Sequence, residues 1–238
     1  MLLGTTKDAL KEPPGKEMTK RLRIVAIDGP AGAGKSTIAK ALAVSLNIPY
    51  LDTGAMYRMV TYAALRDGID LKNESAVADV AKIMNVVMSS DRFIVDDVDV
   101  TDIIRGPQVT EAVSTVAALS AVRSELRASQ RSWVENAGGG VVEGRDIGTV
   151  VFPDATLKVF LTASPAVRAQ RRVAQSGGDV AVIEEQIRQR DHLDSTRADS
   201  PLRESNDSLF IDTTELSIDA VVTQITSSVV SIESNSNE

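Results

Sequence analysis

A glycine-rich segment at residues 29–36 constrains the fold of this chain more than any other feature. It reads GPAGAGKS and matches the phosphate-loop pattern, in which a glycine is followed after four residues by Gly-Lys-Ser/Thr. It follows the apolar run 22–27 and precedes residues 35–46, whose pattern predicts a helix. In that context backbone N–H groups surround a phosphate, Lys35 reaches the β- and γ-phosphates, and the Ser36 hydroxyl serves Mg²⁺, directly or through water.

The segment therefore predicts a site for ATP with Mg²⁺. The residues expected to form it are Gly29, Pro30, Ala31, Gly32, Ala33, Gly34, Lys35, Ser36 and Thr37. A phosphate loop alone does not separate a GTPase switch, an ATPase motor and a small-molecule kinase. The chain holds no Asn-Lys-x-Asp element for reading guanine, and 238 residues are few for a motor domain. These observations favour a small-molecule kinase.

Strand and helix patterns alternate along the chain. Apolar runs at residues 22–27, 50–51, 140–142, 157–161 and 208–211 predict strands. Helical patterns follow them, starting near residues 35, 55, 146, 164 and 217. Such alternation predicts an α/β fold, in which a mainly parallel sheet is covered by helices on both faces.

Two segments interrupt the alternation and are expected to be insertions in a single domain over residues 21–230. Residues 68–105 include short alternating runs at 92–95 and 98–100, which predict a hairpin. Residues 168–203 are helical, charged and interrupted by Ser-Gly-Gly, a pattern typical of a short lid. The core then comprises residues 21–67, 106–167 and 204–230, and residues 1–20 and 231–238 are expected to be flexible.

A second set of polar residues lies at predicted strand ends or on one helix face. Thr53 and Arg58 follow one strand, and Arg145 and Asp146 follow another. The carboxyl ends of parallel strands form one crevice, so these residues should face Lys35. Arg190, Asp194 and Arg197 share a helix face at i, i+4 and i+7. Helix caps, a salt-bridged turn and a surface ion-pair ladder are the plain structural explanations.

The amino-acid composition excludes several kinds of covalent link and metal site, and it disfavours some partners. The chain has no cysteine and a single histidine, His192, which excludes disulfides, thiolate metal sites and multi-histidine metal sites. The net charge of -7 disfavours binding to nucleic acid, and no apolar run reaches the roughly 20 residues that span a bilayer. We expect a cytoplasmic protein without nucleic-acid or membrane partners.

Five motifs together resemble the bacterial cytidylate kinase family, whose fold is related to that of adenylate kinase. They are GPAGAGKST, LDTGAMYR, STVAALSAVR, EGRDIGTVVFPDA and RQRDHLDSTR, within residues 24–225. The resemblance implies a P-loop NTPase core with a monophosphate-binding insertion and a short lid. It also implies Mg²⁺-dependent transfer of the γ-phosphate of ATP to CMP or dCMP. The residues that it places on the CMP side are Thr53, Arg58, Ser114, Arg123, Arg145, Asp146, Arg190, Asp194 and Arg197.

The chemistry of cytosine agrees with this assignment. The N4 amine of cytosine needs an acceptor and its N3 and O2 atoms need donors, and Asp146, Ser114 and Arg123 supply both. Uracil places O4 against the carboxylate, so CMP and dCMP should be preferred over UMP. The family assigns Arg190 and Asp194 to the ribose, and Arg58, Arg145 and Arg197 to the acceptor phosphate.

Catalysis is expected to depend on charge and position, with Lys35, Arg145 and Arg197 acting on the transferred phosphoryl group. A phosphomonoester has a second pKa of about 6, so the acceptor phosphate is largely ionised at neutral pH and needs no general base. We therefore expect no catalytic role for His192. Lid closure should bring arginines onto ATP, with Arg168, Arg171 and Arg172 as candidates.

Two alternatives remain at this point. A related monophosphate kinase with another base preference would place Asp146 and Arg123 away from the acceptor base. A regulatory module that binds ATP as a structural ligand would show no CMP-dependent turnover, and it leaves the second set of arginines unexplained. A monomer is the default expectation, because no exposed heptad pattern indicates a partner helix.

Overall fold

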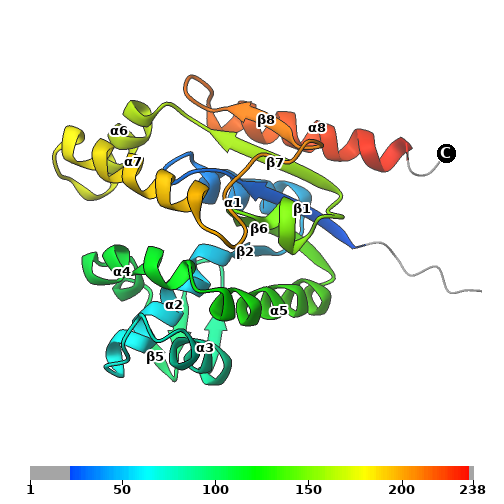
Figure 1. Cartoon of the computed structure of the whole chain (residues 1–238). Coiled ribbons are helices and arrows are strands. Elements are labelled where there is room, and N and C mark those ends of the chain that lie inside the picture. The colour runs from blue at the N-terminus through cyan, green and yellow to red at the C-terminus, as the bar shows by residue number, and fades with distance from the viewer. Residues whose placement is uncertain (1–21, 236–238) are drawn as a thin grey trace, which may run out of the picture.

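The computed structural model describes residues 22–235, and a five-stranded parallel sheet forms its centre (Figure 1). The strand order is β2-β6-β1-β7-β8, and each neighbouring pair runs parallel. The expected extension over residues 1–20 lies outside the described residues. The strands of this sheet are β1 (Arg23–Asp28), β2 (Tyr50–Asp52), β6 (Gly139–Gly144), β7 (Leu157–Thr162) and β8 (Leu209–Asp212).

Helices cover both faces of the sheet, which confirms the predicted α/β fold. Alternate side chains of β1 point to opposite faces, with Ile24 and Ala26 in one core cluster and Val25 and Ile27 in the other. Helices α1 (Lys35–Leu46) and α8 (Ile218–Asn235) pack on the Val25 face. Helices α2 (Thr53–Arg66) and α5 (Ser120–Ala137) pack on the Ile24 face.

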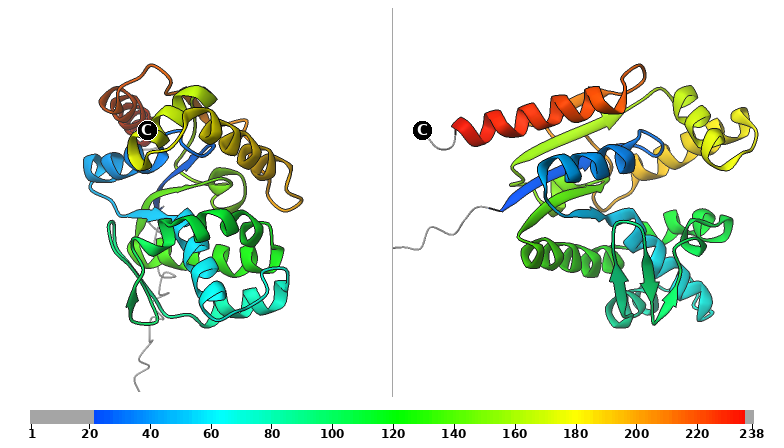
Figure 2. Two further views of the ribbon diagram at one scale, coloured as in Figure 1. Left: turned by 90° about the vertical axis from the view of Figure 1, so that its left-hand side faces the viewer. Right: turned by 180° about the vertical axis from the view of Figure 1, so that it is seen from behind.

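A second layer lies beyond α2 and α5, on the side of the molecule away from α8 (Figure 2). It contains a three-stranded antiparallel sheet in the order β3-β4-β5. The pair β4–β5 confirms the predicted hairpin, whereas α3 and β3 were not predicted. Helix α4 packs on α2, and α3 on α5. The elements are α3 (Glu74–Ile83), β3 (Val86–Met88), β4 (Phe93–Val95), β5 (Val98–Asp99), the 3₁₀-helix η1 (Ile103–Arg105) and α4 (Pro107–Ala117).

A helical hairpin, α6 (Pro165–Ser176) and α7 (Val180–Thr196), projects from the sheet after β7. Ser164 caps α6 by accepting the Val167 N–H at 3.3 Å. Asp179 caps α7 by accepting the N–H groups of Ala181 and Val182 at 2.9 and 3.0 Å. The two helices pack along each other, which agrees with the predicted helical character of residues 168–203. Their role as a lid stays a prediction.

The helix expected near residue 146 is instead a short π-helical turn, η2 (Ile147–Val151). The N–H groups of Val151 and Phe152 reach back five residues, to the carbonyl oxygens of Asp146 and Ile147. Two features keep it short. Pro153 has no N–H to extend a helix, and the first N–H groups of the turn are bound by Asp28 instead of by a helical capping residue.

The expectation of a flexible end from residue 231 was wrong for residues 231–235, because α8 continues through Asn235. Glu233 on this last turn forms an ion pair with Arg23 at the start of β1, which fixes the helix end against the sheet. Residues 236–238 lie outside the described part. No helix within residues 22–235 combines the length and apolar character needed to cross a membrane.

Gly138 and Gly139 offer a matched test of how closely α5 and β6 approach β1. Both have positive φ, at 75° and 124°. A Cβ atom at Gly139 would lie 2.5 Å from the Arg23 carbonyl oxygen, whereas one at Gly138 meets nothing within 4 Å. We expect Gly138→Ala to cost about 1–2 kcal/mol of unfolding free energy, and Gly139→Ala about 3–5 kcal/mol because a backbone clash is added. Guanidinium unfolding measures both, and equal losses would contradict the clash.

Candidate active site

The phosphate loop joins the end of β1 to the start of α1 and takes a shape that its glycines permit. Gly29, Gly32 and Gly34 have φ values of 148°, 78° and 87°. A Cβ atom at Gly29 would lie 1.9 Å from the Leu161 carbonyl oxygen, so no other residue fits there. Gly34 precedes α1 and provides no side-chain cap, which leaves the positive end of this helix for an anion.

Lys35 and Ser36, the first residues of α1, are both held in place by neighbouring oxygen atoms. The buried Lys35 Nζ donates to the Pro30 carbonyl oxygen at 2.8 Å. Burial, and then repulsion from Arg145, lower the pKa of Lys35. The Ser36 hydroxyl donates to Glu143 Oε2 at 3.0 Å, and the Tyr50 hydroxyl donates to the other oxygen of this carboxylate. Burial raises the pKa of Glu143.

The residues after β2 form a second part of the site, where they line the cleft. Asp52 caps α2 by accepting the Ala55 N–H at 2.9 Å, and the Thr53 hydroxyl donates to the Glu143 carbonyl oxygen at 2.6 Å. One turn further, Arg58 donates from Nη1 to the Ile104 carbonyl oxygen at 2.8 Å and to the Thr110 hydroxyl at 2.9 Å. These bonds connect Arg58 to η1 and to the first turn of α4.

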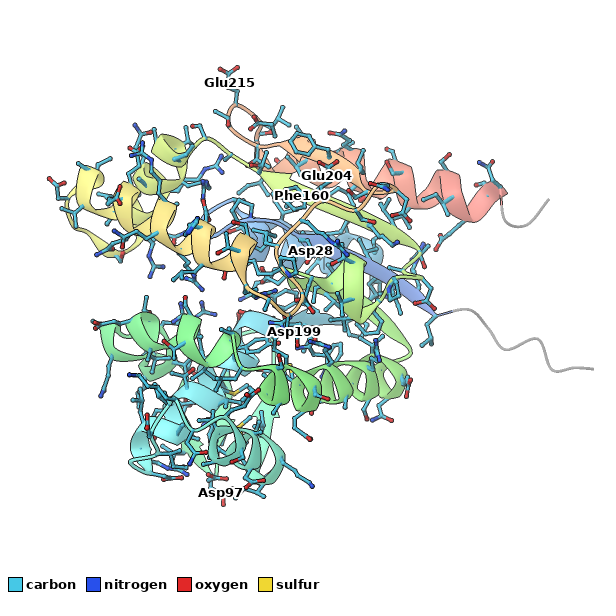
Figure 3. The ribbon with its side chains drawn as sticks, viewed as in Figure 1. Asp28, Asp97, Phe160, Asp199, Glu204 and Glu215 are labelled. Carbon is cyan, nitrogen blue, oxygen red and sulfur yellow. The ribbon has the colours of Figure 1, made fainter. Side chains whose placement is uncertain are left out.

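The turn after β6 connects to α5 and α7 through buried ion pairs. Asp146 accepts from Arg123 at 2.5 Å and lies 3.4 Å from the Arg197 guanidinium. Arg145 pairs with Asp194 of α7 at 2.8 Å. Arg123 is 1% exposed, and its guanidinium carbon also lies 5.6 Å from the centre of the Tyr57 ring. The segment after α7 lies against α5, where Asp199 accepts from Arg127 at 2.5 Å (Figure 3).

Other arginines of this site lack such partners. Arg58, Arg172 and Arg190 form no ion pair with any residue between 22 and 235. Burial, and then repulsion from Arg190, lower the pKa of Arg58 to about 10. Burial, and then repulsion from Arg145, lower that of Arg190 to about 10. Lysine and arginine side chains at the site therefore outnumber the carboxylates by nine to five, which favours an anionic ligand.

A single cleft of about 1250 Å³ joins these parts. All nine residues expected on the CMP side line it, together with six residues of the phosphate loop. The other three expected loop residues, Gly29, Pro30 and Ala33, lie outside the lining. The lining residues that the sequence predicted are Ala31, Gly32, Gly34, Lys35, Ser36, Thr37, Thr53, Arg58, Ser114, Arg123, Arg145, Asp146, Arg190, Asp194 and Arg197.

The three candidate lid arginines have different surroundings. Arg171 and Arg172 line the cleft, and Arg171 donates to the hydroxyl and the carbonyl oxygen of Thr213 at 3.0 and 2.7 Å. Arg168 does not line it. Its guanidinium donates to the carbonyl oxygens of Ala163 and Ala31 and pairs with Asp191 at 2.7 Å, which ties α6 and α7 to the phosphate loop.

Sequence reasoning missed Asp28, whose carboxylate accepts the N–H groups of Ile147 and Gly148 at 2.8 and 2.7 Å. Its signal was an acidic residue directly after the apolar run 24–27 and directly before the phosphate loop. Tyr50 and Tyr57, which contact Glu143 and Arg123, gave no comparable signal. His192 is exposed on α7. The described residues contain no group of three or more histidine, cysteine, aspartate or glutamate side chains suited to a metal.

Residues 25–231 match the family model described as Cytidylate kinase. The chain is 50% identical over 208 residues to a Rhodococcus jostii protein named Cytidylate kinase, covering 84% of this chain and 91% of that relative. It is 47% identical over 207 residues to the protein of the same name from Mycobacterium leprae, covering 85% and 93%.

Solved structures resemble the chain at lower identity. A gluconokinase from Sinorhizobium meliloti has a TM-score of 0.50 and 14% identity, covering 90% of this chain and 94% of its own. A protein from Eubacterium ventriosum has a TM-score of 0.51 and 15% identity, covering 88% and 99%. At these identities the likeness shows the fold alone.

The pKa of Asp28 predicts how stability depends on pH. Burial raises this pKa from 3.8 to about 6, although the two backbone N–H groups oppose the rise. Between pH 4 and 6 the folded protein therefore binds more protons than the unfolded chain, and stability falls as pH rises. We expect the unfolding free energy of the nucleotide-free wild-type protein to fall by about 3 kcal/mol relative to that of Asp28→Asn as the pH rises across this interval.

Urea unfolding at several pH values measures this difference. Asp67→Asn is the control of opposite sign, because the hydrogen bond from Arg66 lowers the pKa of Asp67. The unfolding free energy of the wild-type protein should therefore rise relative to that of Asp67→Asn as the pH rises. A constant difference between wild type and Asp28→Asn would contradict the prediction.

Proposed function

The chain belongs to the cytidylate kinase family, and we propose that its cleft transfers the γ-phosphate of ATP to CMP or dCMP with Mg²⁺, giving ADP and CDP or dCDP. One observation carries the proposal: a phosphate loop and a set of arginines with too few carboxylates face each other across one cleft. Two phosphate-bearing ligands fit such an arrangement, one on each wall.

The donor triphosphate is assigned to the loop of residues 29–37 and to Lys35. The positive end of α1 and the loop N–H groups favour phosphate oxygens. The Lys35 ammonium, now on the Pro30 carbonyl oxygen, would exchange that contact for the phosphates. A bound polyanion would also relieve the repulsion between Lys35 and Arg145.

The residues beside the loop fit Mg²⁺. The Ser36 hydroxyl and the buried Glu143 carboxylate are hydrogen-bonded to each other at 3.0 Å, and both are hard oxygen donors of the kind that this ion prefers. Ser36, with Glu143 beside it, would hold the ion, directly or through water. When bound, Mg²⁺ neutralises charge on the phosphates of the donor.

The acceptor phosphate is assigned to Arg58, Arg145 and Arg197, which enter the cleft from α2, the turn after β6 and the end of α7. Planar guanidinium groups bind phosphate oxygens in pairs. Arg190, without an ion pair of its own, and Asp194 are assigned to the ribose hydroxyls.

The base is assigned to Asp146, Ser114 and Arg123. The Asp146 carboxylate would accept from the cytosine N4 amine, and Arg123 would hold that carboxylate in place while it donates to the ring acceptors. Uracil would bring its O4 oxygen against the same carboxylate, and two facing acceptors leave both without a donor.

The chemical step needs alignment of two polyanions more than proton transfer. The acceptor phosphate is largely ionised at neutral pH and attacks without a general base. Lys35, Arg145 and Arg197 would stabilise the transferred phosphoryl group as its charge redistributes. Movement of α6 and α7 over the cleft would exclude water, with Arg171 and Arg172 on the donor side.

We further propose a monomeric enzyme of the cytoplasm, which agrees with the small nucleotides that it would use. Residues 68–105 would move with the acceptor as the monophosphate-binding insertion, and residues 168–203 would act as the lid.

Asp146 gives the sharpest test of the substrate. ADP release is measured with CMP, dCMP, UMP and AMP as separate acceptors. We expect turnover with CMP and dCMP well above UMP and AMP, and a fall of about 10- to 100-fold in kcat/KM for CMP in Asp146→Ala. Asp146→Asn retains the size and offers an N–H to uracil O4, so its preference for CMP over UMP should shrink.

The control for this experiment is Asp79→Ala, which removes an exposed aspartate from α3. Circular dichroism confirms that each variant is folded, because loss of Asp146 leaves Arg123 without its nearest carboxylate. Equal turnover of CMP and UMP by the wild-type protein would refute the base assignment. Turnover that depends on no acceptor would favour a module that only binds ATP.

Lys35 tests the donor wall. Replacing it in Lys35→Met removes a cation from the transferred phosphoryl group, and we expect kcat to fall by about 100-fold or more. Lys82→Met, on the exposed surface of α3, should leave kcat within about twofold because its ammonium contacts no ligand. A coupled assay of ADP release measures both variants, and similar rates would contradict the role of Lys35.

A further inference from the structure

Asp28 lies in the interior of the molecule at the central sheet and does not line the cleft (Figure 3). We propose that Asp28 is a positioning residue for acceptor recognition, whose carboxylate holds the turn that carries Arg145 and Asp146. The inference rests on the proposed function and adds a residue that touches neither nucleotide.

The Asp28 carboxylate accepts hydrogen bonds from two successive backbone N–H groups. Oδ1 accepts from Ile147 at 2.8 Å and Oδ2 from Gly148 at 2.7 Å, while Asp28 itself is 5% exposed. Two bonds from one rigid group to adjacent residues fix both the position and the orientation of the turn. Arg145 and Asp146 precede these residues directly, so their side chains depend on that orientation.

Asp146 occupies the position before η2 from which a side chain normally caps a helical turn. It makes no such bond, because its two oxygens face Arg123 and Arg197. Without another acceptor, the N–H groups of Ile147 and Gly148 would be buried without hydrogen-bond partners. Asp28 supplies the missing acceptor from another strand, which leaves the Asp146 carboxylate in the cleft.

Asp28 is also fixed independently of this turn. It is the last residue of the central strand β1, in register with Gly144 of β6 and Phe160 of β7. The phosphate loop begins at the next residue, Gly29. Because the sheet holds the Asp28 backbone, loss of the carboxylate should disturb the acceptor turn and leave the donor loop in place. CMP binding should therefore suffer more than ATP binding.

The test compares the two ligands separately in Asp28→Asn, whose amide accepts only one of the two N–H groups. By isothermal titration, we expect the Kd for CMP to rise by about tenfold or more, as expected for a lost charged hydrogen bond, and that for ATP to stay within about twofold. The ratio of kcat/KM for CMP to that for UMP should also fall, because Asp146 is misplaced. A residue with a merely structural role would lower the melting temperature without changing this ratio.

Asp99→Asn is the matched control. Its carboxylate accepts the Thr101 N–H at 3.1 Å in a turn away from the cleft, so both Kd values should stay unchanged. If Asp28→Asn does not fold, the smaller Asp28→Ser replaces it, with thermal shifts by CMP and by ATP at low temperature as the readout. The CMP shift should be lost and the ATP shift kept.

Unchanged CMP affinity and base preference in a folded Asp28 variant would overturn the proposal, as would parallel losses of CMP and ATP affinity. Failure of the proposed function has a different signature, since the wild-type protein would then neither bind CMP nor prefer it to UMP.

Discussion

Repulsion between guanidinium groups is the constraint on which this cleft depends. Arg123, Arg145 and Arg197 are brought together by α5, the turn after β6 and the end of α7, and each lies beside Asp146 or Asp194. Buried charges without partners are costly, so these carboxylates stabilise the arrangement of the three arginines. Arg58 and Arg190 remain without ion pairs within residues 22–235, and burial followed by repulsion from neighbouring arginines lowers the pKa of each.

The parallel sheet brings these groups to one edge. Asp28 and Asp52 end β1 and β2, and Glu143 is the next-to-last residue of β6, which lies between them. The phosphate loop and the turn after β6 both start from this edge. Side-chain contacts then cross between elements that are distant in sequence. Glu143 connects Ser36 to Tyr50, and Asp28 connects β1 to the turn at residue 147. The phosphate loop and the turn after β6 therefore share one support at the edge of the sheet.

Features with a strong local signal were predicted well, and those that depend on distant partners were not. The phosphate loop and the helix over residues 35–46 follow from glycine positions and apolar periodicity. Strand β3 has only three residues, none of them buried, and gave no alternating pattern. The short turn after Asp146 depends on Asp28, and the ordered end of α8 on the ion pair between Glu233 and Arg23. Arg168 was a candidate lid contact to ATP, but its guanidinium binds backbone oxygens of the phosphate loop and of Ala163, between β7 and α6.

The sequence by itself determined the α/β class and the phosphate loop, because these depend on residue type and on spacing along one strand or helix. The resemblance to a known family supplied the full set of other residues that line the cleft. Only the tertiary structure decided how the charges are paired. Asp146 faces Arg123 and Arg197, and Asp28 caps a turn some 120 residues away. Arg190 forms no ion pair with any residue in the described range 22–235. Pairing depends on distances across the sheet of about 3 Å, which local patterns do not encode.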